Sequence, residues 1–398
     1  MSWPSIEFPK AIRKTNVGRE NQILSADIQP FGRFPVVDQG QAFIAGYSDA
    51  DKRVISDDLP VVIFGDHTRC VKYVDFPFIL GADGTKVLKP KEDIFDPKFF
   101  YYALLSLDIP NRGYNRHFTL LKEKHVPKPE KDEQRKIAAV LGVVQRAIEQ
   151  RERLLALTAE LKKALLHQLF TQGLRGEPQK HTEIGPVPES WDLVPLGSLA
   201  KVGNGSTPKR DNDGYWQGGT IPWLNSAKIH ERFITEADQF VTDLAVKECH
   251  LPRVKSGSLL IAITGQGKTL GNSALVSFET CINQHLAYAQ FTSPRAVPEF
   301  VLWFIQTRYE HLRSISQAGG STKGALTCSY LKSYLIPVPP LDEQYEIAAI
   351  FAALDRKEKV HERKLATLSD LFRTLLHQLM TAQIRVHALD LPELEIAQ

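Results

Sequence analysis

The sequence has few cysteines and no long hydrophobic run, and each absence excludes a class of protein. No stretch of about 18 apolar residues is present, which excludes a membrane-spanning helix. The first ten residues, MSWPSIEFPK, lack the apolar core of a secretory signal. The cysteines form no CxxC pair, so we interpret them as free thiols in a reducing cytoplasm rather than a disulfide framework or a metal site. They are Cys70, Cys249, Cys281 and Cys328.

Catalytic and cofactor-binding motifs are also missing. The segment GQGKT at 265–269 is similar to a phosphate-binding loop, but a Walker loop needs a glycine where the sequence has Ala262. No methyltransferase glycine motif with a [DN]PP[YF] sequence, no PD…ExK nuclease cluster, and no HExxH or Cys/His metal spacing occurs. The pair Asp66-His67 has no nucleophile arrangement beside it. We therefore expect a chain that is not an enzyme, and GQGKT is either a plain hairpin loop or a DNA-contacting loop.

The overall composition permits several functions and demands none. The chain has 398 residues, enough for two or three domains, and it is 43% hydrophobic and 24% charged, as an average soluble protein is. Its net charge of +3 permits nucleic-acid binding without arguing for it. The run 112–128 holds five Lys or Arg residues against Glu123 alone. This run is either a solvated face or part of a basic binding surface.

The chain contains an internal repeat. LLHQLFTQGLR at 165–175 returns as LLHQLMTAQIR at 375–385, a shift of 210 positions. With the same shift, PKPEKDEQRKIAAVLGVVQRAIEQ at 127–150 aligns without a gap with PVPPLDEQYEIAAIFAALDRKEKV at 337–360. The period is far longer than that of a solenoid repeat, so we infer a duplicated half-molecule.

Each copy of the repeat predicts one long helix. Prolines precede it, Asp132 and Asp342 are N-cap candidates, and Glu133 and Glu343 suit the positive end of the helix dipole. About 40 residues at ~1.5 Å each give a helix of roughly 60 Å. Apolar residues recur at alternating spacings of four and three, which predicts a coiled-coil seam. The principal seam positions are Ile137, Leu141, Leu165, Leu169, Ile347, Phe351, Leu375 and Leu379.

A helix of this length has to bury its apolar stripe against a partner. Duplicated halves usually relate by a pseudo-two-fold axis, which predicts that the two copies pair antiparallel within one chain. A homodimer through the same helices is the competing interpretation. Arg151, Glu358 and His361 interrupt the seam near its middle, where we expect them to set the register at some cost in stability.

The segments between the helices have the composition of α+β domains. Short β-branched and aromatic runs broken by Gly, Pro, Asn and Asp predict curved, mostly antiparallel sheets. The two halves share an order of parts while their sheet sequences differ, a pattern that indicates two readers with different targets. The sheet segments are 34–49, 59–88 and 256–278, the helical stretches that follow are 97–107 and 297–315, and the polar loops after these are 111–118 and 316–327.

Together these features resemble the specificity subunit of type I restriction-modification systems. In that family two target recognition domains alternate with two conserved helical regions, in the order found here. The helix-opening PxPxxxEQ, ending in Glu133-Gln134 and Glu343-Gln344, is similar to the family's conserved regions. Segment 205–229, with Thr207-Pro208, Tyr215-Trp216 and Ile221-Pro222-Trp223, looks like the opening of a recognition domain, although the first domain departs from this TPxxxxxxYW pattern. FGDHTR (64–69) and TGQGKTLGN (264–272) resemble the loop after a central strand in such domains.

The resemblance implies a pseudo-two-fold α+β architecture. Two mixed α/β target recognition domains with curved sheets would be joined by two long helices that form an antiparallel intramolecular coiled coil. The expected boundaries are 1–130 for the first domain, 131–175 for the first helix, 176–336 for the second domain, 337–385 for the second helix and 386–398 for a C-terminal tail.

The resemblance also implies a non-catalytic DNA-binding function. Each recognition domain would read one half of a bipartite, asymmetric DNA sequence. The helices would space the domains and dock methyltransferase (modification) and ATP-driven restriction subunits, to which S-adenosylmethionine, ATP and Mg²⁺ would belong. Domains about 60 Å apart would lie about two turns apart on DNA, at ~34–36 Å per turn. The alternative is a coiled-coil homodimer whose globular domains bind protein rather than DNA.

Candidate DNA contacts come from the polar loops. Reading base edges needs Arg or Lys for guanine, Asn or Gln for adenine, and Asp or Glu for cytosine, and glycines let backbone approach phosphates. We expect Trp216 and Trp223 in the core or in an interface rather than stacked on DNA. We expect His167 and His377 to make helix-dipole or partner contacts rather than bind metal. The candidates are His67, Arg69, Arg112, Tyr114, Asn115, Arg116 and His117 in the first domain, and Lys209, Arg210, Gln266, Lys268, Ser321, Thr322 and Lys323 in the second.

Overall fold

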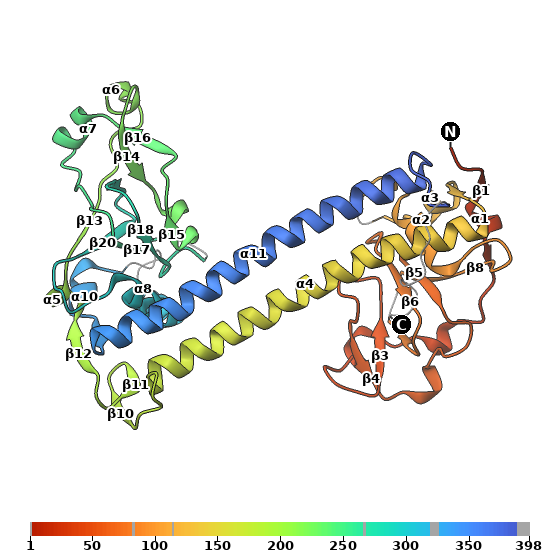
Figure 1. The fold of residues 1–398 in the computed structure, drawn as a ribbon, viewed down its shortest axis with the longest axis horizontal. Helices are drawn as coiled ribbons and strands as arrows, with labels where there is room; N and C mark the ends of the chain where they lie inside the picture. Colours follow the sequence, from red (N-terminus) through yellow and green to blue (C-terminus); the bar gives the residue numbers. More distant parts are fainter. Residues whose placement is uncertain (1, 82–83, 114, 266–267, 319–325, 388–398) are drawn as a thin grey trace. The chain divides into compact units, whose positions relative to one another are not determined.

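The chain forms two compact units, each with one globular domain and one part of each long helix. The computed structural model describes residues 2–81, 84–113, 115–265, 268–318 and 326–387. Unit 1 comprises Met1–Arg153 and His361–Gln398, and unit 2 comprises Leu154–Val360 (Figure 1). The helices therefore contribute to the packing of both units.

Unit 1 is built on two small sheets and a two-stranded pair. Its strands are β1 (Ser5–Glu7), β2 (Ile12–Arg13), β3 (Phe34–Val37), β4 (Gly46–Ser48), β5 (Val61–Gly65), β6 (Val71–Val74), β7 (Ile79–Leu80), β8 (Thr85–Pro90) and β9 (His125–Pro127). One sheet has the order β2–β8–β5–β6 and is antiparallel. The other has the order β4–β3–β7, in which β3 and β7 are parallel. Strand β1 pairs with β9, just before the first long helix.

Unit 2 has the larger set of strands. They are β10 (Gln179–Thr182), β11 (Gly185–Pro188), β12 (Asp192–Pro195), β13 (Ala200–Asn204), β14 (Ile221–Leu224), β15 (Phe233–Ile234), β16 (Gln239–Val241), β17 (Leu259–Ala262), β18 (Ser273–Val276), β19 (Cys281–Ile282), β20 (Leu286–Phe291) and β21 (Leu335–Val338). The sheets have the orders β13–β20–β17–β18–β15 and β16–β14–β19, beside the pairs β10–β11 and β12–β21.

The two units share one topology although their sheet sequences differ. The order β2–β8–β5–β6 matches β13–β20–β17–β18, β4–β3–β7 matches β16–β14–β19, and β1–β9 matches β12–β21. In each unit the central strand, β5 or β17, is buried along its whole length, as the β-branched and leucine-rich sequences require. The prediction of two α+β domains with curved, mostly antiparallel sheets is confirmed.

One apolar helix packs beside the main sheet in each unit. Helix α2 (Pro97–Leu105) begins after Asp96, whose carboxylate accepts the Phe99 N–H and caps the helix. Helix α8 (Pro298–Thr307) is its counterpart in unit 2. The helical stretch expected over 297–315 is two helices, because the chain breaks at Arg308 before α9 (Tyr309–Ala318). The Arg308 guanidinium lies over the Phe304 ring, and burial lowers its pKa.

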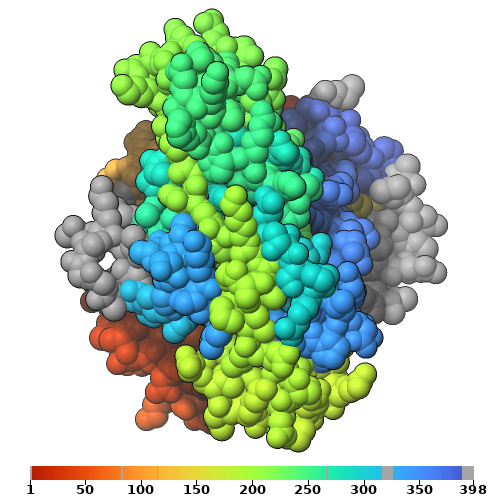
Figure 2. Space-filling model, turned by 90° about the vertical axis from the view of Figure 1, so that its left-hand side faces the viewer, coloured from red at the N-terminus to blue at the C-terminus, as the bar shows by residue number. Residues whose placement is uncertain are grey.

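Short helices complete the two units. Unit 1 contains α1 (Phe8–Ala11) and α3 (Phe118–Lys122), and unit 2 contains α5 (Leu196–Leu199), α6 (Asp213–Trp216), the 3-10 helix η4 (Ser226–Glu231), α7 (Asp243–Glu248) and α10 (Cys328–Ser333). Helices α6 and α7 pack on β14 and β16 around a separate small core that includes Trp223 and Val241. This part projects from the body of unit 2, in green in Figure 2. Trp223 is buried, as expected.

The two long helices are antiparallel in both units. Helix α4 (Lys131–Gln172) has 42 residues and helix α11 (Leu341–Met380) has 40. In unit 1 a carboxylate oxygen of Glu133, at the start of α4, accepts the Val386 N–H just beyond the end of α11 at 2.8 Å. In unit 2 Glu343, at the start of α11, accepts the Leu174 N–H just beyond the end of α4 at 2.9 Å. The antiparallel intramolecular coiled coil is confirmed, and the two glutamates that make these bonds are related by the duplication.

The expected seam positions face the interior. Six of them are buried, and Leu165 and Leu375 are partly buried against the same cores. They also contact the globular domains: Phe351 lies 4.9 Å from the Trp303 ring of α8. The polar position Arg151 lies with its guanidinium 3.3 Å from Nδ1 of His361. The buried six are Ile137, Leu141, Leu169, Ile347, Phe351 and Leu379.

The N-cap prediction for the long helices is wrong. Helix α4 begins at Lys131 and α11 at Leu341, so Asp132 and Asp342 are the second residues of their helices. Their carboxylates still lie in the first turn, where the helix dipole favours negative charge.

A buried glutamine joins each long helix to its globular domain. In unit 1 Gln134 accepts the N–H of Asp96, the residue that caps α2, and donates to the carbonyls of Ile94 and Pro129. In unit 2 Gln344 accepts the N–H of Val297, just before α8, and donates to the carbonyls of Arg295 and Pro339. The repeated Glu-Gln pair therefore ties each helix start to the entry of the domain helix and to the end of the other long helix.

None of the helices in the described part of the chain combines the length and apolarity of a membrane-spanning segment.

Candidate nucleic-acid interface

In unit 1 several loops meet at the end of the central strand β5. The Asp66 N–H donates to the Gly84 carbonyl at 2.7 Å, and the Asp66 carbonyl accepts the His117 N–H at 2.8 Å. The His67 N–H donates to Oε1 of Gln39 at 3.1 Å. The loops that follow β3, β5 and β7 and the loop before α3 are thus bonded to one another. The bond from His117 to Asp66 places His67 near the end of segment 111–117, which holds the other candidate DNA contacts of unit 1.

His117 holds this loop cluster from inside, which corrects the prediction that it contacts DNA. Its side chain is 0% exposed. Its Nδ1 lies 2.9 Å from the Asp66 carbonyl oxygen, and its Nε2 accepts the Arg112 N–H at 3.2 Å. Because Nε2 accepts, the proton belongs on Nδ1 and the ring is neutral. The Asp66 carboxylate in turn accepts the Phe118 N–H at 2.8 Å.

The exposed residues of this cluster remain candidate DNA contacts. Arg112, Asn115 and Arg116 are exposed and His67 is half-buried. Arg69 has a structural role, because its guanidinium donates to the Ile109 carbonyl at 2.9 Å. Its backbone has a φ of 62°, which strains a residue with a side chain and is offset by such contacts.

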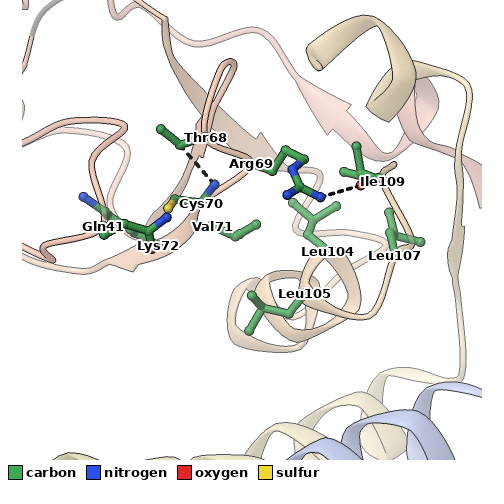
Figure 3. A pocket seen from close by; sticks show the side chains of 10 residues that line it. All are labelled: Gln41, Thr68, Arg69, Cys70, Val71, Lys72, Leu104, Leu105, Leu107 and Ile109. Atoms are coloured by element: carbon green, nitrogen blue, oxygen red, sulfur yellow. Dashed lines mark hydrogen bonds between the residues drawn. The ribbon is translucent and has the colours of Figure 1, made fainter. Parts of the chain in front are cut away.

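A hollow of about 420 Å³ opens beside Arg69 (Figure 3). Leu104, Leu105, Leu107 and Ile109 form its apolar side, and the opposite side includes Gln41 and Lys72. Lys72 is buried, with its ammonium 3.5 Å from the Asp38 carboxylate. Burial lowers the pKa of Lys72, and the Asp38 carboxylate opposes this. The Lys72 ammonium also donates to the Asp38 carbonyl at 2.8 Å. This bond holds the residue that directly follows β3.

In unit 2 the corresponding loops form a polar network of side chains. The Thr207 hydroxyl donates to Oε1 of Gln284, whose amide lies 3.3 Å from Nε2 of His285. The other nitrogen of His285 is hydrogen-bonded to the Thr264 hydroxyl. Three loops, after β13, β17 and β19, are therefore linked by groups that can donate and accept hydrogen bonds. Such groups are the ones that read base edges.

The two basic candidates in 205–210 differ in their surroundings. Lys209 is exposed. The Arg210 guanidinium lies 3.9 Å from the Trp216 ring centre and donates to Oε1 of Gln239 at 2.8 Å. Arg210 is exposed too, but its stacking on Trp216 and its bond to Gln239 leave it less freedom to reach DNA than Lys209 has.

Lys268 is exposed on the loop after β17. The carbonyl of Lys268 accepts from the Asn272 side chain at 2.9 Å and from the Tyr309 hydroxyl at 2.7 Å, so its backbone is fixed. The other candidates lie outside the described residues: Tyr114, Gln266, Ser321, Thr322 and Lys323.

Sequence reasoning missed several residues of these networks. Gln39 in unit 1 and Thr264, Gln284, His285 and His230 in unit 2 were not among the candidates. The available signal was a polar triplet, Asn283-Gln284-His285, that directly follows the buried strand β19. Among the described residues, no group of three or more His, Cys, Asp or Glu side chains is placed to hold a metal ion.

The two ends of the repeat have the same local geometry. The Thr171 hydroxyl donates to the His167 carbonyl at 2.8 Å, and the Thr381 hydroxyl donates to the His377 carbonyl at 2.7 Å. Both histidines are exposed, and the Gln383 amide lies 3.4 Å from Nε2 of His377. The expected partner or dipole role of the two histidines stays a prediction.

The duplicated fold, with polar loops at the end of the central strand in each unit, has the architecture that the resemblance implies. Residues 188–370 match the family described as the type I restriction modification DNA specificity domain. Over these residues the chain is similar to the DNA specificity domains of type I restriction-modification systems.

Relatives and solved structures agree with this family. The chain is 26% identical to the specificity subunit of the Escherichia coli enzymes EcoR124I/EcoR124II, over 81% of this chain and 79% of that protein. It is 32% identical to the MjaIX specificity subunit of Methanocaldococcus jannaschii over 47% of this chain and 43% of that protein. In fold it is similar to the crystal structure of the S subunit from M. genitalium, with a TM-score of 0.64 and 18% identity over 95% of this chain and 96% of that one.

Proposed function

We propose that the two units read the two halves of a bipartite, asymmetric DNA target. The observation that carries this proposal is one fold used twice with different loop chemistry. The cluster in unit 1 presents Arg112, Asn115 and Arg116, whereas the cluster in unit 2 presents Thr207, Gln284 and other uncharged groups beside Lys268. Different donor and acceptor patterns at equivalent places select different base pairs.

The basic groups have a second role in this proposal. Exposed arginines and lysines contact phosphates and position each domain, while the amide, hydroxyl and imidazole groups read bases. Recognition is then binding without catalysis, and S-adenosylmethionine, ATP and Mg²⁺ are bound by partner subunits.

The long helices provide the frame and a docking surface. Leu157 and Leu161 of α4, one turn apart, are each 50% exposed. Apolar side chains at such positions support docking of another apolar surface, which we propose belongs to methyltransferase and restriction subunits. Co-expression with neighbouring genes followed by purification of this chain is expected to recover a methyltransferase.

Genome-wide methylation mapping of the source organism tests the bipartite target. We expect a methylated motif of two short specific blocks separated by an unread spacer. Exchange of residues 181–336 for those of another family member should then change one block and leave the other intact. A single continuous motif, or a change in both blocks, would contradict the proposal.

A further inference from the structure

Unit 2 contains a buried ionic cluster on the helix seam. Lys162 of α4 and Asp355 of α11 are 7% and 8% exposed and form an ion pair. The Lys162 ammonium also lies 3.0 Å from the Glu358 carboxylate. Arg232, from the globular domain, donates to the same Asp355 oxygen at 2.7 Å. The guanidinium of Arg232 lies 4.9 Å from the centre of the Trp303 ring.

Helix pairing by itself does not need these charges. At the repeat shift of 210 positions, Gln145 stands in unit 1 where unit 2 has Asp355, and Phe372 stands where unit 2 has Lys162. Phe372 packs at 6.0 Å on the ring of Tyr102 in α2. Buried ion pairs often contribute less stability than apolar groups of similar size, so the cluster calls for a reason other than stability.

The partner that unit 2 adds is Arg232, and its backbone is strained. Arg232 follows the 3-10 helix η4 with a φ of 56°, in the left-handed region that favours glycine. Its carbonyl accepts the Leu275 N–H of β18 at 2.8 Å. A glycine here would remove the strain, so the arginine side chain has to offset it through Asp355 and Trp303.

The segment that Arg232 anchors holds the loop after β17. Two residues earlier, Nδ1 of the His230 ring accepts from the Asn272 amide at 3.2 Å. Its Nε2 lies 3.4 Å from the Thr269 hydroxyl. The Asn272 amide also donates to the Lys268 carbonyl at 2.9 Å. A chain of contacts therefore runs from Asp355 on the seam through Arg232 and His230 to the candidate reading loop.

We propose that Arg232 is a positioning residue for the half of the DNA target read by unit 2. Its ion pair with Asp355 fixes η4 on the helix seam, and His230 then holds Thr269 and Asn272 of the candidate reading loop in place. This inference rests on the proposed function. It adds that contacts with the long helices determine how well unit 2 discriminates its DNA block from altered sequences. Arg232 itself needs no contact with DNA.

The test uses Arg232→Gln and Asp355→Asn in the full chain, each of which removes one charge with little change of shape. The probes are duplexes that carry the mapped motif, either unchanged or with one base pair altered in the block read by unit 2 or by unit 1. Both variants should lower the discrimination against the unit 2 change by roughly 5- to 10-fold and leave the unit 1 change as in the wild type. Arg232→Lys, which keeps a cation near Asp355, should recover part of the lost discrimination against the unit 2 change.

Two further variants separate positioning from folding. Arg295→Gln breaks an exposed ion pair of the same unit, with Asp192 at 2.6 Å, and should leave both discriminations unchanged. Arg232→Gly relieves the backbone strain while removing the side chain, so it should fold with a thermal midpoint near the wild type and still lose discrimination in the unit 2 block.

The outcomes are distinct. Wild-type discrimination in Arg232→Gln, or an equal loss in both blocks, would overturn the positioning role. Failure of the wild-type chain to prefer its mapped motif would overturn the proposed function and this inference together.

Discussion

Replacing Gln344 with leucine tests how the recognition domain is joined to the helix frame. Gln344 is 1% exposed. It makes three hydrogen bonds, each 2.8 Å long, to the Val297 N–H and the carbonyls of Arg295 and Pro339. Leucine has a similar volume and helix propensity but leaves these three backbone groups without their side-chain partner.

The magnitude follows from those three groups. A stranded buried donor or acceptor costs about 1–3 kcal/mol, with the lower end for the part-buried Arg295 carbonyl. The substitution should lower the free energy of unfolding of unit 2 by about 3–5 kcal/mol. For a urea dependence of about 2 kcal/mol per molar, the unfolding midpoint falls by roughly 2 M.

Tryptophan fluorescence in a urea titration measures this change selectively. Unit 2 holds Trp191, Trp216, Trp223 and Trp303, whereas unit 1 holds only Trp3 of the five tryptophans. Gln134→Leu breaks the equivalent contacts of unit 1 and should leave the fluorescence midpoint nearly unchanged.

The control is Gln150→Leu, at an exposed position on α4. A midpoint shift below about 0.3 M for Gln344→Leu, corresponding to about 0.6 kcal/mol, would refute the reasoning. Equal shifts for Gln134→Leu and Gln344→Leu would show that each glutamine does not act locally.

Two other predictions concern buried groups with defined chemistry. His117→Leu removes the acceptor for the Arg112 N–H and the donor to the Asp66 carbonyl, so binding to the block read by unit 1 should weaken about tenfold while the other block is unaffected. His117→Gln, which can donate and accept, should bind more tightly than His117→Leu in fluorescence anisotropy; equal weakening of both blocks would contradict this. Burial raises the pKa of the Cys281 thiol from 9.0 to about 11, so iodoacetamide at pH 8 should leave Cys281 unmodified in the folded protein, as mass spectrometry can show. The unfolded thiol ionises first as pH rises, so the free energy of unfolding should fall between about pH 9 and 11; prompt native labelling would be the contrary result.

The two long helices were predictable because their sequence occurs twice in the chain. The alternation of Ile137, Leu141 and their counterparts predicts two helices with an apolar seam. Their antiparallel pairing within one chain was predicted from the duplication, with a homodimer as the alternative. The helix starts were misplaced because Asp132 satisfies the rule for an N-cap equally well as a first-turn acid. The break between α8 and α9 at Arg308 was not predicted, because no proline or glycine marks it in the sequence.

The loops that meet in the candidate site could be selected from the sequence, whereas the surroundings of their individual residues could not. Composition draws attention to the 111–117 loop, but the burial of His117 depends on a carbonyl 51 positions earlier in the sequence. Arg69 and Arg210 are basic residues in polar loops, yet one is bonded to Ile109 and the other stacks on Trp216. Such assignments follow from tertiary neighbours, which local sequence does not encode. Gln284 was missed for the same reason, since only the fold brings it to Thr207.

The Arg232–Asp355 pair joins the segment 181–336 to the helix frame. Exchange of residues 181–336 moves Arg232 with the recognition domain, whereas Asp355 and Lys162 stay with the helices. An incoming domain without a cation at this place leaves Asp355 with Lys162 alone and its η4 segment unanchored. We therefore expect a domain exchange to be tolerated best when the incoming domain also carries a cation at the place of Arg232.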